Sequence, residues 1–268
     1  MASYNHMSAW TPILLEVAEN VRSRIRNALL KRSALDVAEL KGLLDSEAQA
    51  AIEETLGHLG ASVQLISEEG DVTIGDGEMY LIADPVDGTT NLARGIPLAV
   101  TSLAISETPR LSGAVAGLVM DLYTGDVYRA ERNRGALRGG KRINPAGPRG
   151  LREALISVDI SKGAPLEPVR AVIAKARHLR QLGCAALSLC LVASGIMDAH
   201  IDLRGMLRAT DVAAGLVILK EAGGIYSIDG AIGGDLELTR QSRLDLIAAS
   251  GPGLLGDILG LLEQRQRA

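Results

Sequence analysis

The sequence predicts an α+β protein built from two halves, and three patterns in the residue order support this class. Between residues 12 and 60, apolar side chains recur at spacings of three and four, which is typical of amphipathic helices. Residues 62–131 contain short apolar runs bounded by Gly, Asp, Asn or Pro, which is typical of strands. Beyond residue 150, helical and strand patterns alternate, which indicates an α/β arrangement.

The first half is expected to contain two helices followed by a mostly antiparallel sheet. The first helix covers residues 12–30 and begins behind Thr11, and the second runs from about Asp45 to Gly60. The predicted strands are residues 62–67, 79–84, 100–106, 114–121 and 126–131.

The second half begins after a segment rich in turn residues, INPAGPRG at 143–150. This boundary predicts an N-terminal α+β domain at 8–148 and a C-terminal α/β domain at 149–268. The elements predicted beyond it are strands 154–159, 197–202, 224–228 and 244–249, and helices 165–176, 183–194, 211–222 and 253–265. Residues 1–7, MASYNHM, are interpreted as an expression remnant with a natural start at Met7 or Ser8.

Composition excludes several classes of function. The chain has 268 residues, a net charge of -4, 2% aromatic residues and no sustained Lys/Arg block, so it lacks the features of a nucleic-acid binder. It also contains no uncharged apolar stretch long enough for a membrane span and no signal-peptide layout, which predicts a cytoplasmic protein without a membrane partner. Cys184 and Cys190 are expected to be buried free thiols.

The segment DPVDGTTN, residues 84–91, carries the chemistry. Pro85 has no N–H, so it is expected to stop the strand ladder and leave the carboxylates of Asp84 and Asp87 at the strand end. The carbonyl group of Val86 is left unpaired in the same place. Gly88 then permits a positive φ, and the following Thr-Thr-Asn presents hydroxyl and N–H groups that can bind an anion.

Other carboxylates can join this segment. Glu68 and Glu69 follow the predicted strand 62–67, and Asp211 opens the helical pattern 211–222, where a role as N-cap is the competing explanation. If the carboxylates converge, each like-charged pair at about 4 Å costs about 4 kcal/mol at an effective dielectric near 20. Cations offset this cost, and Mg²⁺ prefers such hard oxygen ligands. The cluster is therefore predicted to bind Mg²⁺ and, once loaded, a phosphate ester.

Three segments carry a family resemblance. Glu68-Glu69, residues 84–91 and the run TDVAAG at 210–215 resemble the signature segments of the inositol monophosphatase superfamily of Mg²⁺-dependent, lithium-sensitive phosphatases. The chain is most similar to archaeal members, which hydrolyse inositol monophosphate and fructose 1,6-bisphosphate. The resemblance implies a layered αβαβα sandwich, the sugar phosphatase fold. It also implies a first domain that binds metal and phosphate, a second domain that completes the substrate site, and a homodimer.

The resemblance assigns roles to individual residues. It implies two or three Mg²⁺ ions, with Mn²⁺ able to substitute. Their ligands would be Glu68, Asp84, Asp87, Asp211 and the main-chain oxygen of Val86. The catalytic residues would be Glu68, Thr89 and Asp45, with the threonine orienting a water molecule for attack on phosphorus. Asp45 is placed ahead of the second helix, and Leu44 stands where the family usually has a hydroxyl residue.

The substrate implied is a small phosphorylated polyol or sugar. Gly88, Thr89 and Thr90 would hold its phosphate, while Gly183, Cys184 and Ala185, within RQLGCAA, would line its organic part. The contacts expected for a second phosphate or a substrate oxygen are Arg180, Arg204 and Lys162.

Two alternative functions stay open at this stage. The first is a 3′-phosphoadenosine 5′-phosphate phosphatase, which shares the metal motifs but would need an adenine pocket, and the few aromatic residues speak against stacking there. The second is a regulatory protein that keeps the metal site without turnover. Such a protein would be expected to lack a ligand or the water-orienting threonine, and all of these residues are present.

Overall fold

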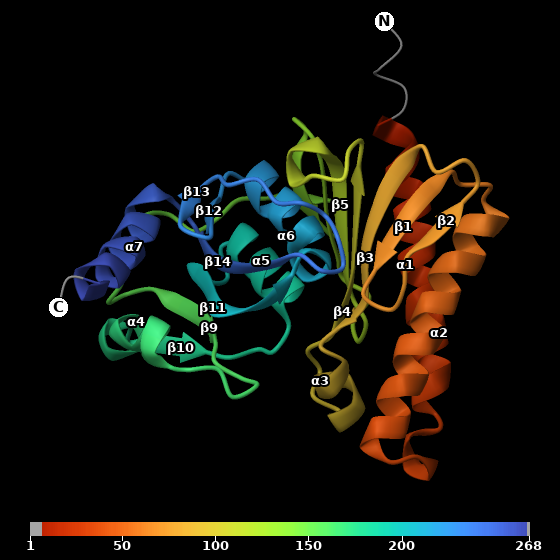
Figure 1. Cartoon of the computed structure of the whole chain (residues 1–268), viewed down its shortest axis with the longest axis horizontal. Helices are drawn as coiled ribbons and strands as arrows, with labels where there is room; N and C mark the ends of the chain where they lie inside the picture. The colour runs from red at the N-terminus through yellow and green to blue at the C-terminus, as the bar shows by residue number, and fades with distance from the viewer. Residues whose placement is uncertain (1–6, 267–268) are drawn as a thin grey trace, which may run out of the picture.

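The protein is a sandwich of alternating helical layers and sheets, shown in Figure 1. The computed structural model describes the backbone of residues 7–266 and the side chains of residues 10–262. The helices of the three helical layers are α1 (Met7–Leu29) and α2 (Val37–His58), then α5 (Ala185–Ala193) and α6 (Ala209–Ala222), and finally α4 (Arg170–Lys175) and α7 (Pro252–Gln266). One sheet lies between each successive pair of layers, so the predicted αβαβα arrangement is confirmed.

The first sheet has the order β2-β1-β3-β4-β5-β6-β7-β8. Its strands are β1 (Val63–Ser67), β2 (Val72–Ile74), β3 (Met79–Asp87), β4 (Val100–Ser106), β5 (Ala114–Asp121), β6 (Val127–Glu131), β7 (Gly135–Arg138) and β8 (Lys141–Ile143). Only β1 and β3 pair in parallel, and every other neighbouring pair is antiparallel. The prediction of a mostly antiparallel first sheet is confirmed.

The second sheet is mixed and has the order β10-β9-β11-β14-β12-β13. Its strands are β9 (Leu155–Asp159), β10 (His178–Arg180), β11 (Ala199–Arg208), β12 (Ile225–Ile228), β13 (Ala231–Ile232) and β14 (Arg243–Ala249). The pairs β10–β9 and β9–β11 are parallel, and the remaining pairs are antiparallel. Sequence patterning missed β2, β7, β8, β10 and β13, because strands of two to four residues are too short to show a period.

Short helical segments complete the fold. They are the helix α3 (Thr89–Arg94) and the 3₁₀ turns η1 (Arg32–Ala34), η2 (Leu111–Gly113) and η3 (Glu167–Val169). Across the helices of the described region, none is long and apolar enough to cross a membrane.

The expression remnant was predicted at residues 1–7. Of these, residues 1–6 lie outside the described residues, and Met7 begins α1. The predicted domain boundary falls in the connection between β8 and β9. The division into two domains stays a prediction, because the helices α5 and α6 of the second half pack against the first sheet in one continuous apolar core.

The middle helical layer is apolar nearly all round because it is enclosed by a sheet on each side. In α6, the side chains of Val212, Leu216, Ile218 and Leu219 are all buried. A helix that is apolar on every face belongs in a core. The first turn of α6, which carries Asp211, is thereby fixed against both sheets.

The close contact between α6 and the first sheet depends on Gly117 in β5. A Cβ atom added at this glycine would lie 2.8 Å from the main-chain oxygen of Ala214 and 3.2 Å from its Cα atom. We expect Gly117→Ala to lower the free energy of unfolding by about 1–3 kcal/mol, because backbone atoms cannot move aside as a flexible side chain can. Urea unfolding measures this change.

A matched control for that substitution is Gly256→Ala in the exposed part of α7, where an added Cβ meets nothing within 4 Å. This variant is expected to be neutral or stabilised by up to about 1 kcal/mol, since alanine has the higher helix propensity. Equal losses of stability in the two variants would contradict the importance of the α6–β5 contact.

The second helix begins earlier than predicted, and the expectation that Asp45 precedes it is wrong. Asp36 caps the helix by accepting hydrogen bonds from Ala38 N (2.8 Å) and Glu39 N (2.9 Å). The Glu39 carboxylate in turn accepts from the main-chain N–H of Asp36 at 2.9 Å, which completes a capping box. Asp45 therefore lies inside α2, where the helix backbone fixes its position.

The strand that carries the motif also differs from the prediction, since Pro85 does not end it. β3 continues to Asp87 through an irregularity in the pairing with β4 between Asp84 and Asp87. Pairing between β3 and β1 stops at Ala83. No neighbouring strand therefore needs a hydrogen bond from the N–H group that Pro85 lacks. On the other side, the Thr101 hydroxyl donates to the Pro85 carbonyl at 2.9 Å.

Candidate active site

Three carboxylates from distant parts of the chain converge beside the irregular end of β3. They are Glu68, which follows β1, Asp84 in β3, and Asp211 in the first turn of α6. One carboxylate oxygen of each lies within 4.8 Å of the others. Such a cluster can hold a metal ion, and its donors are all hard oxygen atoms of the type that Mg²⁺, Mn²⁺ and Ca²⁺ prefer.

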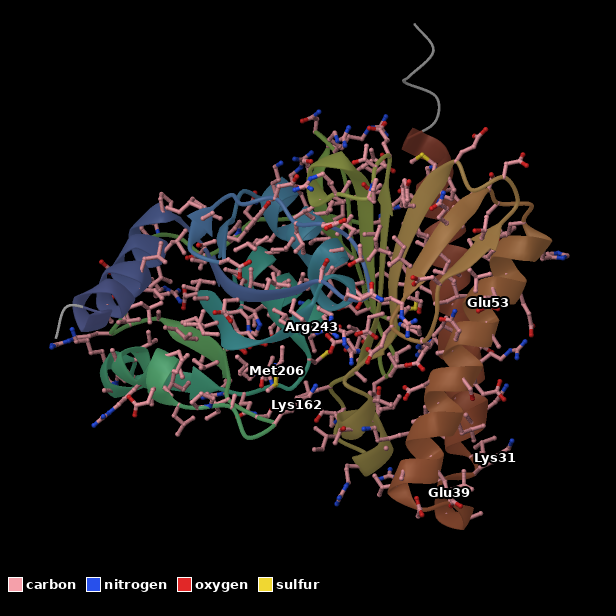
Figure 2. All side chains as sticks on the ribbon, viewed as in Figure 1. Lys31, Glu39, Glu53, Lys162, Met206 and Arg243 are labelled. Atoms are coloured by element: carbon pink, nitrogen blue, oxygen red, sulfur yellow. The ribbon has the colours of Figure 1, made fainter. Side chains whose placement is uncertain are left out.

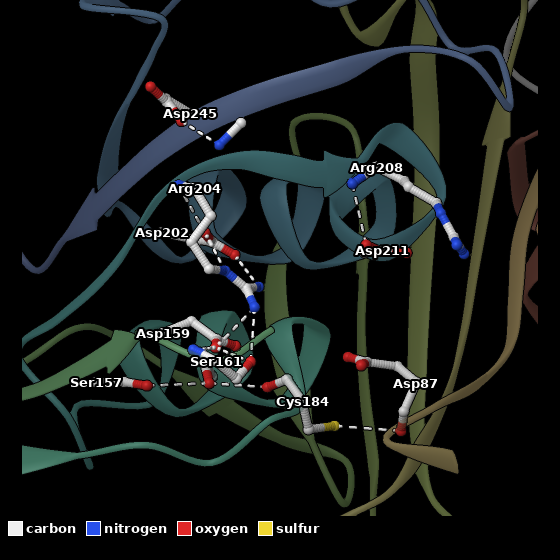
Figure 3. Close-up of polar contacts among 12 residues, drawn as sticks. Asp87, Ser157, Asp159, Ser161, Cys184, Asp202, Arg204, Arg208, Asp211 and Asp245 are labelled. Atoms are coloured by element: carbon white, nitrogen blue, oxygen red, sulfur yellow. Dashed lines mark hydrogen bonds and ion pairs between the residues drawn. The ribbon is translucent and has the colours of Figure 1, made fainter. Parts of the chain in front are cut away.

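Asp87 lies beside this cluster and is held by the start of α5. The main-chain N–H of Ala186 donates to Asp87 Oδ2 at 2.7 Å. The thiol of Cys184 donates to the main-chain oxygen of Asp87 at 3.4 Å, as Figure 3 shows. The second half of the protein therefore orients one of the carboxylates predicted from the first half.

The carboxylates destabilise one another's charged forms. Removal from water, followed by the charge of Asp87, raises the pKa of Asp84 well above its ordinary value. Removal from water and the charge of Asp211 raise the pKa of Asp87 to about 7. The pKa of Asp211 is also raised, mainly by removal from water. Carboxylates arranged at this cost are typical of functional sites, and a bound cation would relieve the repulsion.

Arg208 contacts two members of the cluster. Its main-chain N–H donates to Asp211 Oδ2 at 3.0 Å, and its guanidinium group forms an ion pair with the Glu68 carboxylate. A second arginine, Arg240, donates from Nη2 to the main-chain oxygen of Glu68 at 3.2 Å. Two arginines of the second half thus fix the position of Glu68, which belongs to the first half.

Thr89 and Asp45 form a dyad at the edge of the cluster. The Thr89 hydroxyl oxygen lies 3.0 Å from Asp45 Oδ1 and 2.9 Å from the main-chain oxygen of Val86. One hydroxyl hydrogen serves only one of these acceptors at a time. Removal from water, followed by the charge of Glu69, raises the pKa of Asp45 to about 6. The Asp45 carboxyl group can therefore take up or release a proton near neutral pH.

The backbone around Gly88 is fixed by a conformation that other residues rarely adopt. Gly88 has φ 93°, and a Cβ atom there would lie 2.6 Å from the main-chain oxygen of Leu98. The following Thr90 hydroxyl accepts a hydrogen bond of 3.2 Å from Nζ of Lys41 in α2. The sequence therefore needs a glycine at the turn that presents both threonines.

The predicted substrate segment is brought to this turn. The Asn91 side-chain amide donates to the main-chain oxygens of Leu182 (2.8 Å) and Leu98 (3.0 Å), which ties the segment before α5 to the turn at Gly88. Gly183 follows with φ 62°. The side chains of Cys184 and Ala185 are buried, so this segment presents mainly its backbone to the site.

The three predicted basic contacts behave differently. Lys162, exposed and with φ 61°, lowers the pKa of Asp211 through its charge and therefore lies near the cluster. Figure 2 shows it on the side of the second half that faces the first sheet. Arg180 is exposed on β10 and donates to the carbonyl oxygen of Leu179 at 2.8 Å. Its role as a substrate contact stays a prediction.

Arg204 is bound within the protein by carboxylates, and its role as a contact for a second substrate phosphate stays a prediction. Its side chain is 8% exposed, and its guanidinium group lies 3.0 Å from Asp159 and 2.6 Å from Asp202. It also donates to the Ser161 hydroxyl at 2.7 Å, as Figure 3 shows. With these carboxylates already paired to it, Arg204 holds β9 and β11 together behind the site.

Two cations at the site, Arg240 and Lys41, were not predicted from the sequence, and they contact Glu68 and the turn at Gly88. Arg208 was predicted only as a candidate substrate contact, and its ion pair with Glu68 was not predicted. Arg208 stands three residues before Asp211, so its spacing from a predicted ligand was an available signal. Arg240 is 172 positions from Glu68, and no local pattern links the two.

Comparison with known proteins adds to this geometry. The chain matches the Inositol monophosphatase family over residues 7–264. It is 34% identical over 243 residues to fructose-1,6-bisphosphatase/inositol-1-monophosphatase of Archaeoglobus fulgidus, covering 88% of this chain and 91% of the relative. A solved structure from Pyrococcus horikoshii, described as having similarities to inositol-1 monophosphatase, superposes with a TM-score of 0.80. That alignment has 26% identity and covers 95% of this chain and 98% of the other.

A further relative has two functions in its name. The bifunctional NADP phosphatase/NAD kinase of Methanococcus maripaludis is 33% identical over 230 residues, which cover 77% of this chain and 40% of that protein.

The layered fold and the carboxylate cluster together define a class, the phosphatases that work with a metal site between two sheets. Within that class, the chain belongs to the inositol monophosphatase family. The family resemblance expected from the three sequence segments is confirmed.

Proposed function

We propose that the protein is a Mg²⁺-dependent phosphomonoesterase that hydrolyses inositol monophosphate and fructose 1,6-bisphosphate. The observation that carries this proposal is the convergence of Glu68, Asp84 and Asp211, with oxygens within 4.8 Å of one another, next to the Thr89–Asp45 dyad. The similarity to archaeal relatives named for both substrates supports the choice of substrate.

The metal site would be formed by the four carboxylates of Glu68, Asp84, Asp87 and Asp211 with the main-chain oxygen of Val86. The raised pKa values and the all-oxygen donor set fit a hard divalent cation. When bound, Mg²⁺ supplies positive charge to the phosphate oxygens and makes water a stronger nucleophile. The number of ions, two or three, and the substitution by Mn²⁺ belong to this proposal.

The chain's own groups orient the reactants. Thr89 Oγ1 lies 3.0 Å from Asp45 Oδ1, so it can pass its hydrogen to Asp45 while it accepts one from a water molecule held in line with the phosphorus. The turn at Gly88 presents the Thr89 and Thr90 groups that we propose hold the phosphate.

The organic part of the substrate would lie against the segment that precedes α5. Gly183, Cys184 and Ala185 are tied to the phosphate-binding turn, so a molecule held by its phosphate at Gly88 would meet their backbone. Lys162, near Asp211, is the basic side chain that we propose contacts a substrate oxygen or a second phosphate.

One assay tests the proposal. Phosphate release is measured from inositol 1-phosphate, fructose 1,6-bisphosphate, NADP and 3′-phosphoadenosine 5′-phosphate, with Mg²⁺ and with a chelator. The expected result is release from the first two substrates that the chelator abolishes. Release from none of the four, with metal binding intact, would favour the regulatory protein instead.

A nucleotide is the second candidate substrate. The similarity to a relative named NADP phosphatase/NAD kinase favours it, because that relative removes a phosphate from an adenosine ribose. Faster release from NADP or from 3′-phosphoadenosine 5′-phosphate than from the sugar and inositol phosphates would select this candidate. A cytoplasmic location and a homodimer stay predictions, and sedimentation of the purified protein tests the second.

A further inference from the structure

We propose that Arg208 is a built-in competitor of the metal ion, which occupies Glu68 in the metal-free protein and is released to bind an anion when a divalent cation takes its place. This inference rests on the proposed function, because it requires Glu68 to be a metal ligand. It concerns the order in which cation and phosphate bind, which the proposed function leaves open.

The position of Arg208 is the first support. Its main chain is anchored beside the cluster, because its N–H donates to Asp211 Oδ2 at 3.0 Å. Its side chain extends away from Asp211 toward the strands of the first sheet, as Figure 3 shows, and there forms the ion pair with Glu68. The main-chain anchor would persist when the side chain changes partner.

The distribution of charge is the second support. Within the described side chains, Glu68 is the one predicted carboxylate ligand that forms an ion pair, while Asp84, Asp87 and Asp211 form none. Arg208 also contacts Asp211, whose Oδ2 accepts a hydrogen bond from the Arg208 main-chain N–H at 3.0 Å. The guanidinium group therefore supplies to the metal-free cluster part of the positive charge that a divalent cation would supply.

Accessibility is the third support. The side chains of Arg208 and Glu68 are each 31% exposed, so their ion pair lies at the edge of the cluster, where exchange of partners needs no opening of the core. Arg240 holds the main-chain oxygen of Glu68 at 3.2 Å, which keeps the residue in place while its carboxylate turns to a new partner.

The consequence is a coupling between two ligands of opposite charge. A cation that binds the Glu68 carboxylate must displace the guanidinium group, so the ion pair lowers cation affinity. Once displaced, the guanidinium group remains beside the cluster and offers paired N–H donors of the geometry that phosphate oxygens accept. Bound cation then raises anion affinity, and the same coupling applies in reverse.

The competing explanation is an ordinary exposed ion pair that contributes a little stability. On this explanation, removing the Arg208 side chain leaves the cation affinity unchanged, or lowers it because Glu68 becomes less ordered. The two explanations therefore differ in the sign of the change in cation affinity.

The first experiment measures Mn²⁺ binding to the metal-free protein by titration calorimetry. The variants are Arg208→Gln, which removes the charge, and Arg208→Lys, which keeps it. Arg208→Gln is expected to bind Mn²⁺ about five- to tenfold more tightly than the starting protein, because both the ion pair and the repulsion of the cation are removed. Arg208→Lys is expected to change affinity by less than about threefold.

Arg243→Gln is the matched control. Arg243, labelled in Figure 2, carries the same charge and pairs with Arg208 across β11 and β14. Its Nη1 donates to the main-chain oxygens of Arg240 (2.7 Å) and Ser242 (3.0 Å). Its removal is expected to change Mn²⁺ affinity by less than about twofold, since it contacts no predicted ligand. An equal gain in Mn²⁺ affinity in both variants would show that the gain comes from the loss of any positive charge in this region, and it would overturn the proposal.

The second experiment measures binding of inorganic phosphate at saturating Mg²⁺. Here Arg208→Gln is expected to bind phosphate about tenfold more weakly, because the released guanidinium group is missing. Opposite changes in cation and phosphate affinity are the signature of the proposal, and an ion pair with a purely structural role produces neither.

The outcomes separate this inference from the proposed function. If the starting protein binds Mn²⁺ and releases phosphate from its substrates but Arg208→Gln binds Mn²⁺ with equal or lower affinity, only the role of Arg208 is overturned. If the starting protein binds no divalent cation, the proposed function fails first. Circular dichroism of each variant establishes that it is folded, and the Arg208 main-chain contact to Asp211 is retained in every substitution.

Discussion

Asp87→Asn is expected to lower phosphate release about 10²–10³-fold while making the metal-free protein more stable at pH 8. The loss of activity follows from removing one charged ligand of the cation that stabilises the reacting phosphate. The gain in stability follows from the position of the carboxylate, whose charged form is opposed by removal from water and by Asp211. Asparagine is close in shape and can still accept the hydrogen bond from Ala186 N.

The gain must depend on pH in a defined direction. The pKa of Asp87 is about 7 in the folded protein against an ordinary value of 3.8, so between these values the folded state binds more protons than the unfolded state. Stability contributed by this group therefore falls as pH rises through that window. The asparagine variant lacks this loss. Its advantage should be small near pH 4 and reach on the order of 4 kcal/mol at pH 8.

Urea unfolding in the presence of a chelator, at pH 5 and pH 8, measures this difference. Asp76→Asn is the matched control, because Asp76 is an exposed carboxylate in the connection between β2 and β3, outside the cluster. An asparagine variant at position 87 that is less stable than the starting protein at pH 8 would contradict the assignment of Asp87 to a strained cation site. Full activity in that variant would remove it from the metal ligands.

Thr89→Val is expected to reduce kcat by about 10²–10⁴-fold, the range found for the loss of a group that transfers or positions a proton. Valine keeps the branched shape but removes the hydroxyl group that lies between Asp45 and the Val86 carbonyl oxygen. Because substrate phosphate would still meet the turn and the cation, KM is expected to change much less than kcat.

Thr89→Ser supplies the control for this substitution, because it retains the hydroxyl group and should keep activity within about tenfold. Steady-state kinetics of Thr89→Val, Thr89→Ser, Asp45→Asn and the double variant Thr89→Val/Asp45→Asn test whether the two residues act as a unit. If the two residues act together, the double variant should lose little more activity than the worse single variant. Multiplying losses would show that Thr89 and Asp45 act independently.

The sequence was sufficient to predict the layered fold and to select the carboxylates that converge. Asp84 follows an apolar run, Glu68 follows another, and Asp211 begins a helical pattern, so the sequence placed each at a predicted element end. In the structure Asp84 lies inside β3, beside the irregular part of its pairing with β4. The family resemblance then supplied the pairing of these segments, which hydrophobic patterning alone does not contain.

Errors arose where a local signal was outweighed or where tertiary contacts decide. The capping box of Asp36 and Glu39 is present in the sequence, but the predicted start of the helix rested on the apolar spacing from Asp45 onward. The ion pairs of Arg204 with Asp159 in β9 and Asp202 in its own strand β11 were not predicted. The pair with Asp159 depends on the register of β9 beside β11, which a single sequence does not reveal.

The middle layer of α5 and α6 has a consequence for how the protein could be divided. Because these helices belong to the second half yet pack against the first sheet, a chain cut between β8 and β9 would expose a large apolar face on each fragment. Neither fragment would retain a complete set of acidic side chains. Fragment complementation would therefore restore cooperative folding and metal chemistry in the same event, with reassociation of the two pieces as the step that creates the catalytic centre.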